Sequence, residues 1–97
     1  MNELSSFEKY GEMAKSYMTK NREWMGLKDL SESEFTHVCE IARSILLSRD
    51  GILKGGSFVQ AIINNDLRGA VNYADATCAK AIKSFVVLYQ NCDSYNY

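Results

Sequence analysis

The stretch SESEFTHVCEIARSILLSRDG, residues 31–51, decides the fold class because it carries a helix start, a helical repeat and a helix stop in succession. Ser31 and Glu34 have the spacing of a capping box, in which each side chain binds the backbone N–H of the other residue. The apolar side chains that follow recur every three or four residues, as on one face of a helix. They are Phe35, Val38, Cys39, Ala42, Ile45 and Leu46. Asp50-Gly51 predicts the end of this helix, since glycine readily takes the left-handed conformation after a last turn.

The segment before this helix has the same helical character. Ser5 and Glu8 form a second candidate capping box, and the residues after them share one stripe at steps of three and four. The stripe comprises Phe7, Tyr10, Ala14, Tyr17, Asn21 and Trp24. We therefore expect a first helix that reaches about Trp24 and is loosened at its end by Gly26 and Asp29.

The remaining segment predicts shorter helices and then a longer one. Ser57 is expected to cap a helix over residues 58–63, and Asn65 or Asp66 to cap the next. At Asp75 the chain either starts a further capped helix or passes straight into a long last helix. No segment alternates in the manner of a strand. The predicted fold class is all-α, a small bundle of four to five helices in which an N-terminal helix precedes a compact helical core.

Length and charge limit the class of protein. A chain of 97 residues forms one domain, residues 1–97, with no room for a second core. The net charge of −1 gives no basic field of the kind that drives DNA binding. The apolar runs are far shorter than a membrane span, and the N-terminus has no apolar segment typical of a signal peptide. We expect no DNA partner, no membrane partner and a cytoplasmic location.

The residue types needed for catalysis or metal binding are sparse. Cys39, Cys78 and Cys92 are far apart, and His37 is the single histidine, so the sequence does not offer the four clustered ligands of a structural zinc site. Lys54 precedes the glycines, whereas the lysine of a phosphate-binding loop follows them. The acidic residues are typical of helix caps. The sequence thus predicts no enzyme, no cofactor and no metal.

A first binding feature is the cationic and aromatic segment 13–28. Its lysines and arginine outnumber its single acid, Glu23, and Lys20 and Trp24 are four residues apart, hence neighbours on a helix surface. An aromatic ring stacks on a base and an ammonium group neutralises phosphate. The alternative is that the aromatic residues belong to the core and the lysines are merely solvated.

A second binding feature is the sequence KGGSF, residues 54–58. Lys54, the backbone N–H groups of Gly55 and Gly56, and the hydroxyl of Ser57 immediately precede a helix start. Free N–H groups at such a start bind anions, and glycine lets a ligand or a second subunit approach the backbone. The alternative is a plain loop between helices, capped by Ser57.

Residues 51–75 resemble a pattern found in many short phage and prophage proteins, Gly-Ser-Phe-x-x-Ala-(apolar)₂-x-Asn-Asp-Leu-x-x-Ala-x-x-Arg-Ala-Asp. The matching residues are Gly56, Ser57, Phe58, Ala61, Ile62, Ile63, Asn65, Asp66, Leu67, Ala70, Ala74 and Asp75. The chain departs from the pattern at Lys54 and Gly55, where the family usually has two prolines, and at Tyr73, where it has arginine.

This pattern is similar to that of the phage anti-CBASS sponge family. The resemblance implies a small all-helical homo-oligomer, typically a hexamer, which binds cyclic di- and trinucleotide messengers of host defence in the host cytoplasm without cutting them. In that family an N-terminal tyrosine and a downstream lysine hold the ligand, and Tyr10 and either Lys20 or Lys28 are the nearest candidates. The candidate ligand-binding residues are Tyr10, Lys20, Trp24, Lys28, Gly55, Gly56, Ser57 and Tyr73.

An alternative function belongs to a different class of protein. The helices carry more apolar surface than so small a chain needs for its core, which is typical of a phage-encoded interaction module that blocks a host protein. A DNA-binding helix-turn-helix protein is disfavoured, because no basic recognition helix is present.

Overall fold

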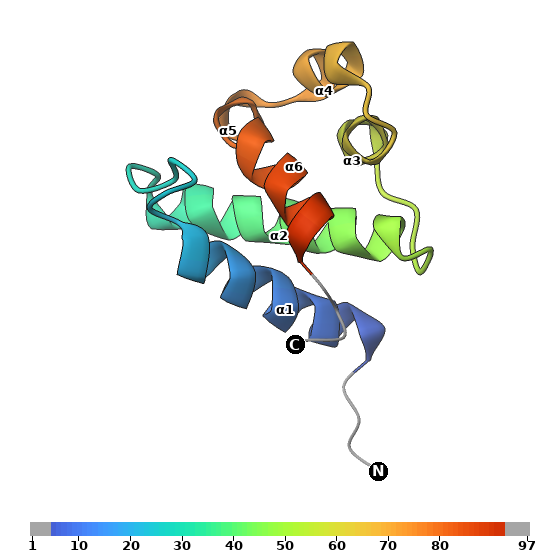
Figure 1. Cartoon of the computed structure of the whole chain (residues 1–97), viewed down its shortest axis with the longest axis horizontal. Helices are drawn as coiled ribbons and strands as arrows, with labels where there is room; N and C mark the ends of the chain where they lie inside the picture. The colour runs from blue at the N-terminus through green and yellow to red at the C-terminus, as the bar shows by residue number, and fades with distance from the viewer. Residues whose placement is uncertain (1–4, 93–97) are drawn as a thin grey trace.

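The computed structural model describes residues 5–92, and within that range it contains six α-helices and no β-strand (Figure 1). The helices are α1 (Ser6–Asn21), α2 (Glu32–Arg49), α3 (Ser57–Ile63), α4 (Leu67–Tyr73), α5 (Ala76–Lys80) and α6 (Ile82–Asn91). The prediction of a small all-α bundle is confirmed. The helix count exceeds the expected four to five because the last helical segment is broken at Ala81.

The two long helices begin at the serines that the sequence identifies. Ser5 accepts a hydrogen bond from Glu8 N at 3.2 Å. Ser31 forms the complete capping box with Glu34, since Glu34 N donates to Ser31 Oγ and Ser31 N donates to Glu34 Oε1. These local bonds satisfy N–H groups that a helix start leaves without a partner. The two helices lie side by side and form the base of the fold (Figure 1).

The first helix ends at Asn21, earlier than the predicted Trp24. Asn21 Nδ2 donates to Tyr17 O at 2.8 Å, and the chain then turns through Gly26, whose φ is +77°. Trp24 therefore lies in the turn after α1. Its predicted position one helical turn beyond Lys20, on a common helix face, is wrong.

Two of the four shorter helices begin at an aspartate that caps them. Asp66 caps α4 by accepting a bond from Gly69 N at 3.0 Å, and Asp75 caps α5 by accepting one from Cys78 N at 2.7 Å. Of the two alternatives at Asp75, the separately capped helix is the one observed. The break before α6 comes at Ala81, whose N–H donates to Cys78 O at 3.0 Å.

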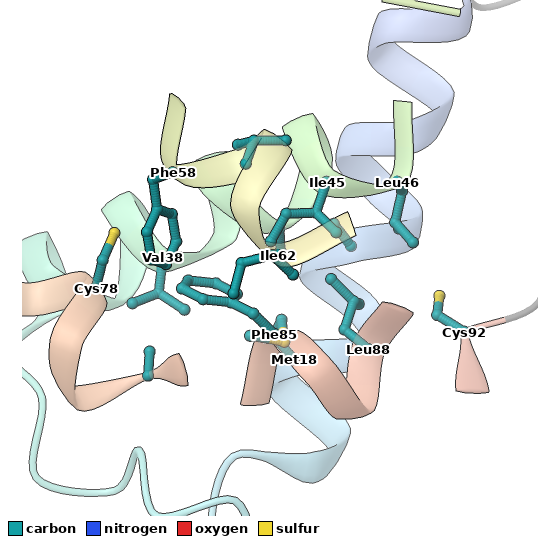
Figure 2. Packing of buried hydrophobic residues seen from close by; sticks show 14 of the residues in the cluster. Met18, Val38, Ile45, Leu46, Phe58, Ile62, Cys78, Phe85, Leu88 and Cys92 are labelled. Carbon is teal, nitrogen blue, oxygen red and sulfur yellow. The ribbon is translucent and has the colours of Figure 1, made fainter. Parts of the chain in front are cut away.

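The core lies where α3 and α6 cover the α1–α2 pair (Figures 1 and 2). Phe85 is fully buried, and the ring of Phe58 meets it edge-on with 5.6 Å between centroids. Every helix supplies at least one buried apolar side chain. The predicted stripe of the first helix is buried at Tyr10, whereas its ends, Phe7 and Trp24, are 47% and 56% exposed.

A polar network fastens the end of α2 to α1 and α6. Arg49 Nη1 donates to Tyr89 O at 3.0 Å and to Cys92 O at 2.7 Å, and Arg49 also pairs with Asp50. Tyr10 Oη donates to Asp50 Oδ2 at 2.6 Å. The hydrogen bond from Arg49 lowers the pKa of the Asp50 carboxyl, and the bond from Tyr10 adds to this, whereas burial opposes it. The network thus joins three helices at one end of the bundle.

Candidate functional site

Four of the predicted ligand-binding residues come together around one groove, between the loop before α3 and the end of α4. The groove has a volume of about 410 Å³, inside the range of roughly 300–1,000 Å³ that is typical of small-molecule sites. Its lining includes Lys54, Gly55, Gly56, Ser57, Asp66 and Tyr73. We call this feature the α3–α4 groove.

The loop that forms one wall of the groove is fastened to the end of α2. Gly55 N donates to Ser48 Oγ at 2.7 Å, and Ser48 Oγ donates to Leu53 O at 2.9 Å. The prediction that the N–H of Gly55 is available to hold an anion is therefore wrong. Gly55 instead fixes the loop, because its N–H is one of the contacts that hold the loop against α2.

The start of α3 leaves backbone donors open. Gly56 occupies the N-cap position, so Ser57 is the first helical residue and the prediction that it caps the helix is wrong. No side chain of residues 5–92 caps this helix. The first N–H groups of a helix have no intrahelical partner, and Gly56 and the exposed Ser57 at the start of α3 line the groove.

The two glycines of the loop differ in whether the packing around them tolerates a side chain. A Cβ atom at Gly55 would lie 2.6 Å from Cγ1 of the buried Val59, so the packing requires glycine there. Gly56 has φ −73° and ψ −172°, an extended conformation open to any residue. A Cβ atom at Gly56 would meet nothing within 4 Å. The fold thus explains the first glycine and leaves the second unexplained.

The groove also presents an aromatic ring and two charged side chains. Tyr73 is the last residue of α4 and is 61% exposed. Lys54 is exposed, and Asp66 has one carboxylate oxygen engaged by the N–H of Gly69. The groove therefore offers a flat ring, a cation, open N–H donors and one carboxylate acceptor.

The other predicted residues do not reach this groove. Tyr10 is 8% exposed and its hydroxyl donates to Asp50, so its ring is not available for stacking. Trp24 is exposed, and its Nε1 donates to Asn21 Oδ1 at 2.7 Å. Lys20 and Lys28 are exposed at the end of α1 and in the α1–α2 turn. The structure thus places the first binding feature on the other half of the fold, away from the second.

A larger groove of about 610 Å³ runs between α1 and α2. Its lining carries four acids and three cations: Glu8, Glu12, Glu32, Glu40, Lys15, Arg22 and Arg43. Two of the cations already lie over rings, Arg22 over Phe35 at 4.0 Å and Arg43 over Phe7 at 3.7 Å. This excess of acid is unfavourable for a polyanion.

A second group of reactive side chains lies between α2 and α5. His37 Nε2 is 2.8 Å from Asp75 Oδ2 and 3.8 Å from Cys78 Sγ. Burial raises the pKa of the Cys78 thiol to about 12, and the hydrogen bond to Asp75 adds to this. In a nucleophilic triad the acid and the nucleophile contact opposite nitrogens of the ring. Here both contact the same nitrogen, so the group lacks the arrangement of a triad.

Sequence reasoning missed this group. The i, i+3 spacing of Asp75 and Cys78 at a helix start is readable from the sequence, because an N-cap and the third helical residue approach each other. His37 lies on α2, 38 residues before Asp75. No local sequence signal links it to Asp75 or Cys78.

Comparison of the chain with protein-family models, with curated protein sequences and with solved structures finds no match. Among the helices of residues 5–92, none combines the length and the apolar character needed to cross a bilayer.

Proposed function

We propose that this chain binds and sequesters cyclic di- or trinucleotide messengers of host defence without hydrolysing them, as a phage protein in the host cytoplasm. The observation that carries the proposal is the α3–α4 groove, in which the exposed ring of Tyr73 shares one lining with Lys54 and the Gly56–Ser57 backbone. The resemblance of residues 51–75 to the sponge family supports the same function, because these residues build the groove.

The chemistry of the groove matches the parts of a nucleotide. A ring such as that of Tyr73 stacks on a base with roughly 1–3 kcal/mol per base. The Lys54 ammonium and the open N–H groups at the start of α3 suit a phosphate. The carboxylate of Asp66 can accept a hydrogen bond from the exocyclic amino group of a purine.

The proposal includes a homo-oligomer, with the hexamer as the expected form. A base stacked on Tyr73 would keep one face in solvent on a single protomer, because the ring lies at the surface. A second subunit can cover that face. Leu67 and Val71 of α4, which carries Tyr73, are 70% and 57% exposed and supply apolar area for such a contact. Size-exclusion chromatography with light scattering measures the subunit number.

Calorimetric titration of the purified protein with a panel of cyclic di- and trinucleotides tests the proposal. We expect saturable heat with at least one member and recovery of that nucleotide uncut. Tyr73→Ala should weaken binding by about 5- to 150-fold, the equivalent of one lost stacking contact. Trp24→Ala is the matched control, because this ring is similarly exposed but lies outside the groove.

Two results would contradict different parts of the proposal, one the function and the other the location of the site. Absence of heat with every nucleotide would remove the function. Loss of binding in Trp24→Ala with full binding in Tyr73→Ala would keep the function and move the site to the N-terminal segment, where Lys20 and Lys28 lie.

A second candidate, a protein-interaction module that inhibits a host protein, is favoured by one observation. Leu67 and Val86 border the same shallow pocket and are 70% and 40% exposed, and Val71 lies one turn beyond Leu67 on α4. A stoichiometric host partner that Leu67→Ser no longer captures, together with a nucleotide-free mass spectrum of the denatured sample, would favour this candidate over the first.

A further inference from the structure

Three donor atoms of different chemistry converge between α2 and α5. A ring nitrogen of His37, a carboxylate oxygen of Asp75 and Sγ of Cys78 all lie within 4.8 Å of one another. The histidine comes from α2, the aspartate is the N-cap of α5, and the cysteine lies inside α5. His37 and Asp75 are partly open to solvent, with side chains 39% and 57% exposed, whereas Cys78 is buried.

The convergence occurs on a single nitrogen of the imidazole. Nε2 lies 2.8 Å from Asp75 Oδ2 and 3.8 Å from Cys78 Sγ. An imidazole nitrogen, a carboxylate oxygen and a cysteine sulfur are each a possible metal ligand, so a cation held between them can bind all three together.

Two of the three separations are close to those of a tetrahedral ion. With bonds of about 2.0–2.1 Å to nitrogen or oxygen and about 2.3 Å to sulfur, two ligands of one Zn²⁺ ion stand roughly 3.3–3.6 Å apart. The observed 2.8 and 3.8 Å therefore need adjustments of about half an ångström. The carboxylate of Asp75 and Sγ of Cys78 lie within 4.8 Å of each other, so this pair would close by about 1.2 Å at most. The exposed histidine and aspartate side chains have room for such a shift.

We propose that His37, Asp75 and Cys78 form a binding site for a divalent transition-metal ion of the Zn²⁺ type. The mixture of nitrogen, oxygen and sulfur donors selects this class over Mg²⁺ and Ca²⁺, which prefer oxygen ligands alone. Water completes the fourth position on the open side. Binding replaces the thiol proton of Cys78 by the metal and releases that proton to solvent.

The ion would join α2 to α5 independently of the α3–α4 groove. Asp75 can ligate without giving up its cap, because Oδ1 holds Cys78 N while Oδ2 faces His37. Glu34, one turn before His37 on α2, and Lys80 of α5 form an ion pair at 3.4 Å, so their charges compensate each other.

Titration of the reduced protein with Co²⁺, followed by its absorption spectrum, tests this site. We expect one ion per chain, a thiolate-to-cobalt charge-transfer band, displacement of Co²⁺ by Zn²⁺, and a rise in Tm with Zn²⁺. Cys78→Ser should abolish the charge-transfer band, and Cys39→Ser, at a half-buried cysteine of α2 outside the cluster, should retain it.

Two further variants keep the test valid if Cys78→Ser folds poorly. His37→Ala changes a partly exposed side chain and should weaken metal binding by about 10-fold or more. Asp75→Asn keeps a good N-cap but loses the anionic ligand, so it should weaken binding while α5 remains capped. The proposal is overturned if the reduced wild-type protein shows no saturable binding, or if His37→Ala and Asp75→Asn bind Co²⁺ as the wild type does.

Discussion

Gly55 and Gly56 give the sharpest test of the α3–α4 groove, because the fold needs only the first of them to be glycine. The methyl group of Gly55→Ala would lie 2.6 Å from Cγ1 and 2.8 Å from Cβ of the buried Val59. Overpacking of this kind typically costs about 1–3 kcal/mol. Since 1 kcal/mol shifts Tm by about 4–8 °C in a domain of this size, Gly55→Ala should lower Tm by about 4 °C or more.

Gly56→Ala should leave the stability nearly unchanged. The backbone at Gly56 suits alanine, and the added methyl group meets nothing within 4 Å. Alanine is a poorer N-cap than glycine, which costs roughly 0.5–1 kcal/mol. It also reduces the freedom of the unfolded chain, which stabilises by about 0.4–1 kcal/mol. The two effects oppose each other, so the net change should stay within about 0.5 kcal/mol.

The effects of the two substitutions on ligand affinity should have the opposite order, with the larger loss in Gly56→Ala. A methyl group at Gly56 stands where a phosphate would approach the open N–H groups, so we expect the affinity for a cyclic nucleotide to fall about tenfold or more, equivalent to 1.4 kcal/mol. Urea denaturation and calorimetric titration of both variants measure the two effects separately. Equal destabilisation by the two substitutions would refute the packing argument, and unchanged affinity of Gly56→Ala would refute the approach of a ligand to this backbone.

Three further predictions concern the fold that holds the groove. Arg49→Met removes charged hydrogen bonds to Tyr89 O and Cys92 O and should destabilise by about 2–3 kcal/mol in urea denaturation; a change below about 0.5 kcal/mol would contradict the role given to this network. The lowered pKa of Asp50 means that its stabilising effect is complete above its ordinary pKa of 3.8 and is lost as the pH falls through the folded value. Stability measured against pH should therefore fall less steeply in the acid range for Asp50→Asn than for the wild type, and parallel curves would contradict this. Phe85→Ala removes a fully buried ring from the core and should lower the free energy of unfolding by about 3–5 kcal/mol. Thermal denaturation should show this loss as a fall in Tm. A fall of only a few degrees would contradict the prediction and would mean that the core collapses into the cavity.

Features that depend on a few neighbouring residues could be predicted from the sequence. The sequence predicts the cap at Ser31 and offers Asp66 and Asp75 as caps among two alternatives each, because the side chain and the N–H group it binds lie within three residues of each other. The helix stop at Gly51 has the same local cause, since its φ of +75° suits glycine. Local chemistry was enough to obtain the helical class and most helix starts.

Features that depend on contacts across the fold were missed or misplaced. The sequence leaves Tyr10 either in the core or at a binding surface, because its partner Asp50 is 40 residues away. The end of the first helix was placed too late, because the stripe continues through Trp24 while the turn is set by Gly26. The role of Gly55 depends on Val59 and on a serine of α2, and only the folded chain shows that it differs from Gly56.

The short link between α4 and α5 explains why the two candidate sites lie so near each other in the chain. Tyr73 ends α4 in the groove, and Asp75 starts α5 in the metal-binding cluster, with Ala74 alone between them. Different hydrogen bonds fix the end of α4 and the start of α5. Ala74 N donates to Ala70 O at the end of α4, whereas Asp75 accepts from Cys78 N and contacts His37 at the start of α5. The pattern that resembles the sponge family ends at this same aspartate, so its last residues have a structural reason to be present whether or not a nucleotide binds.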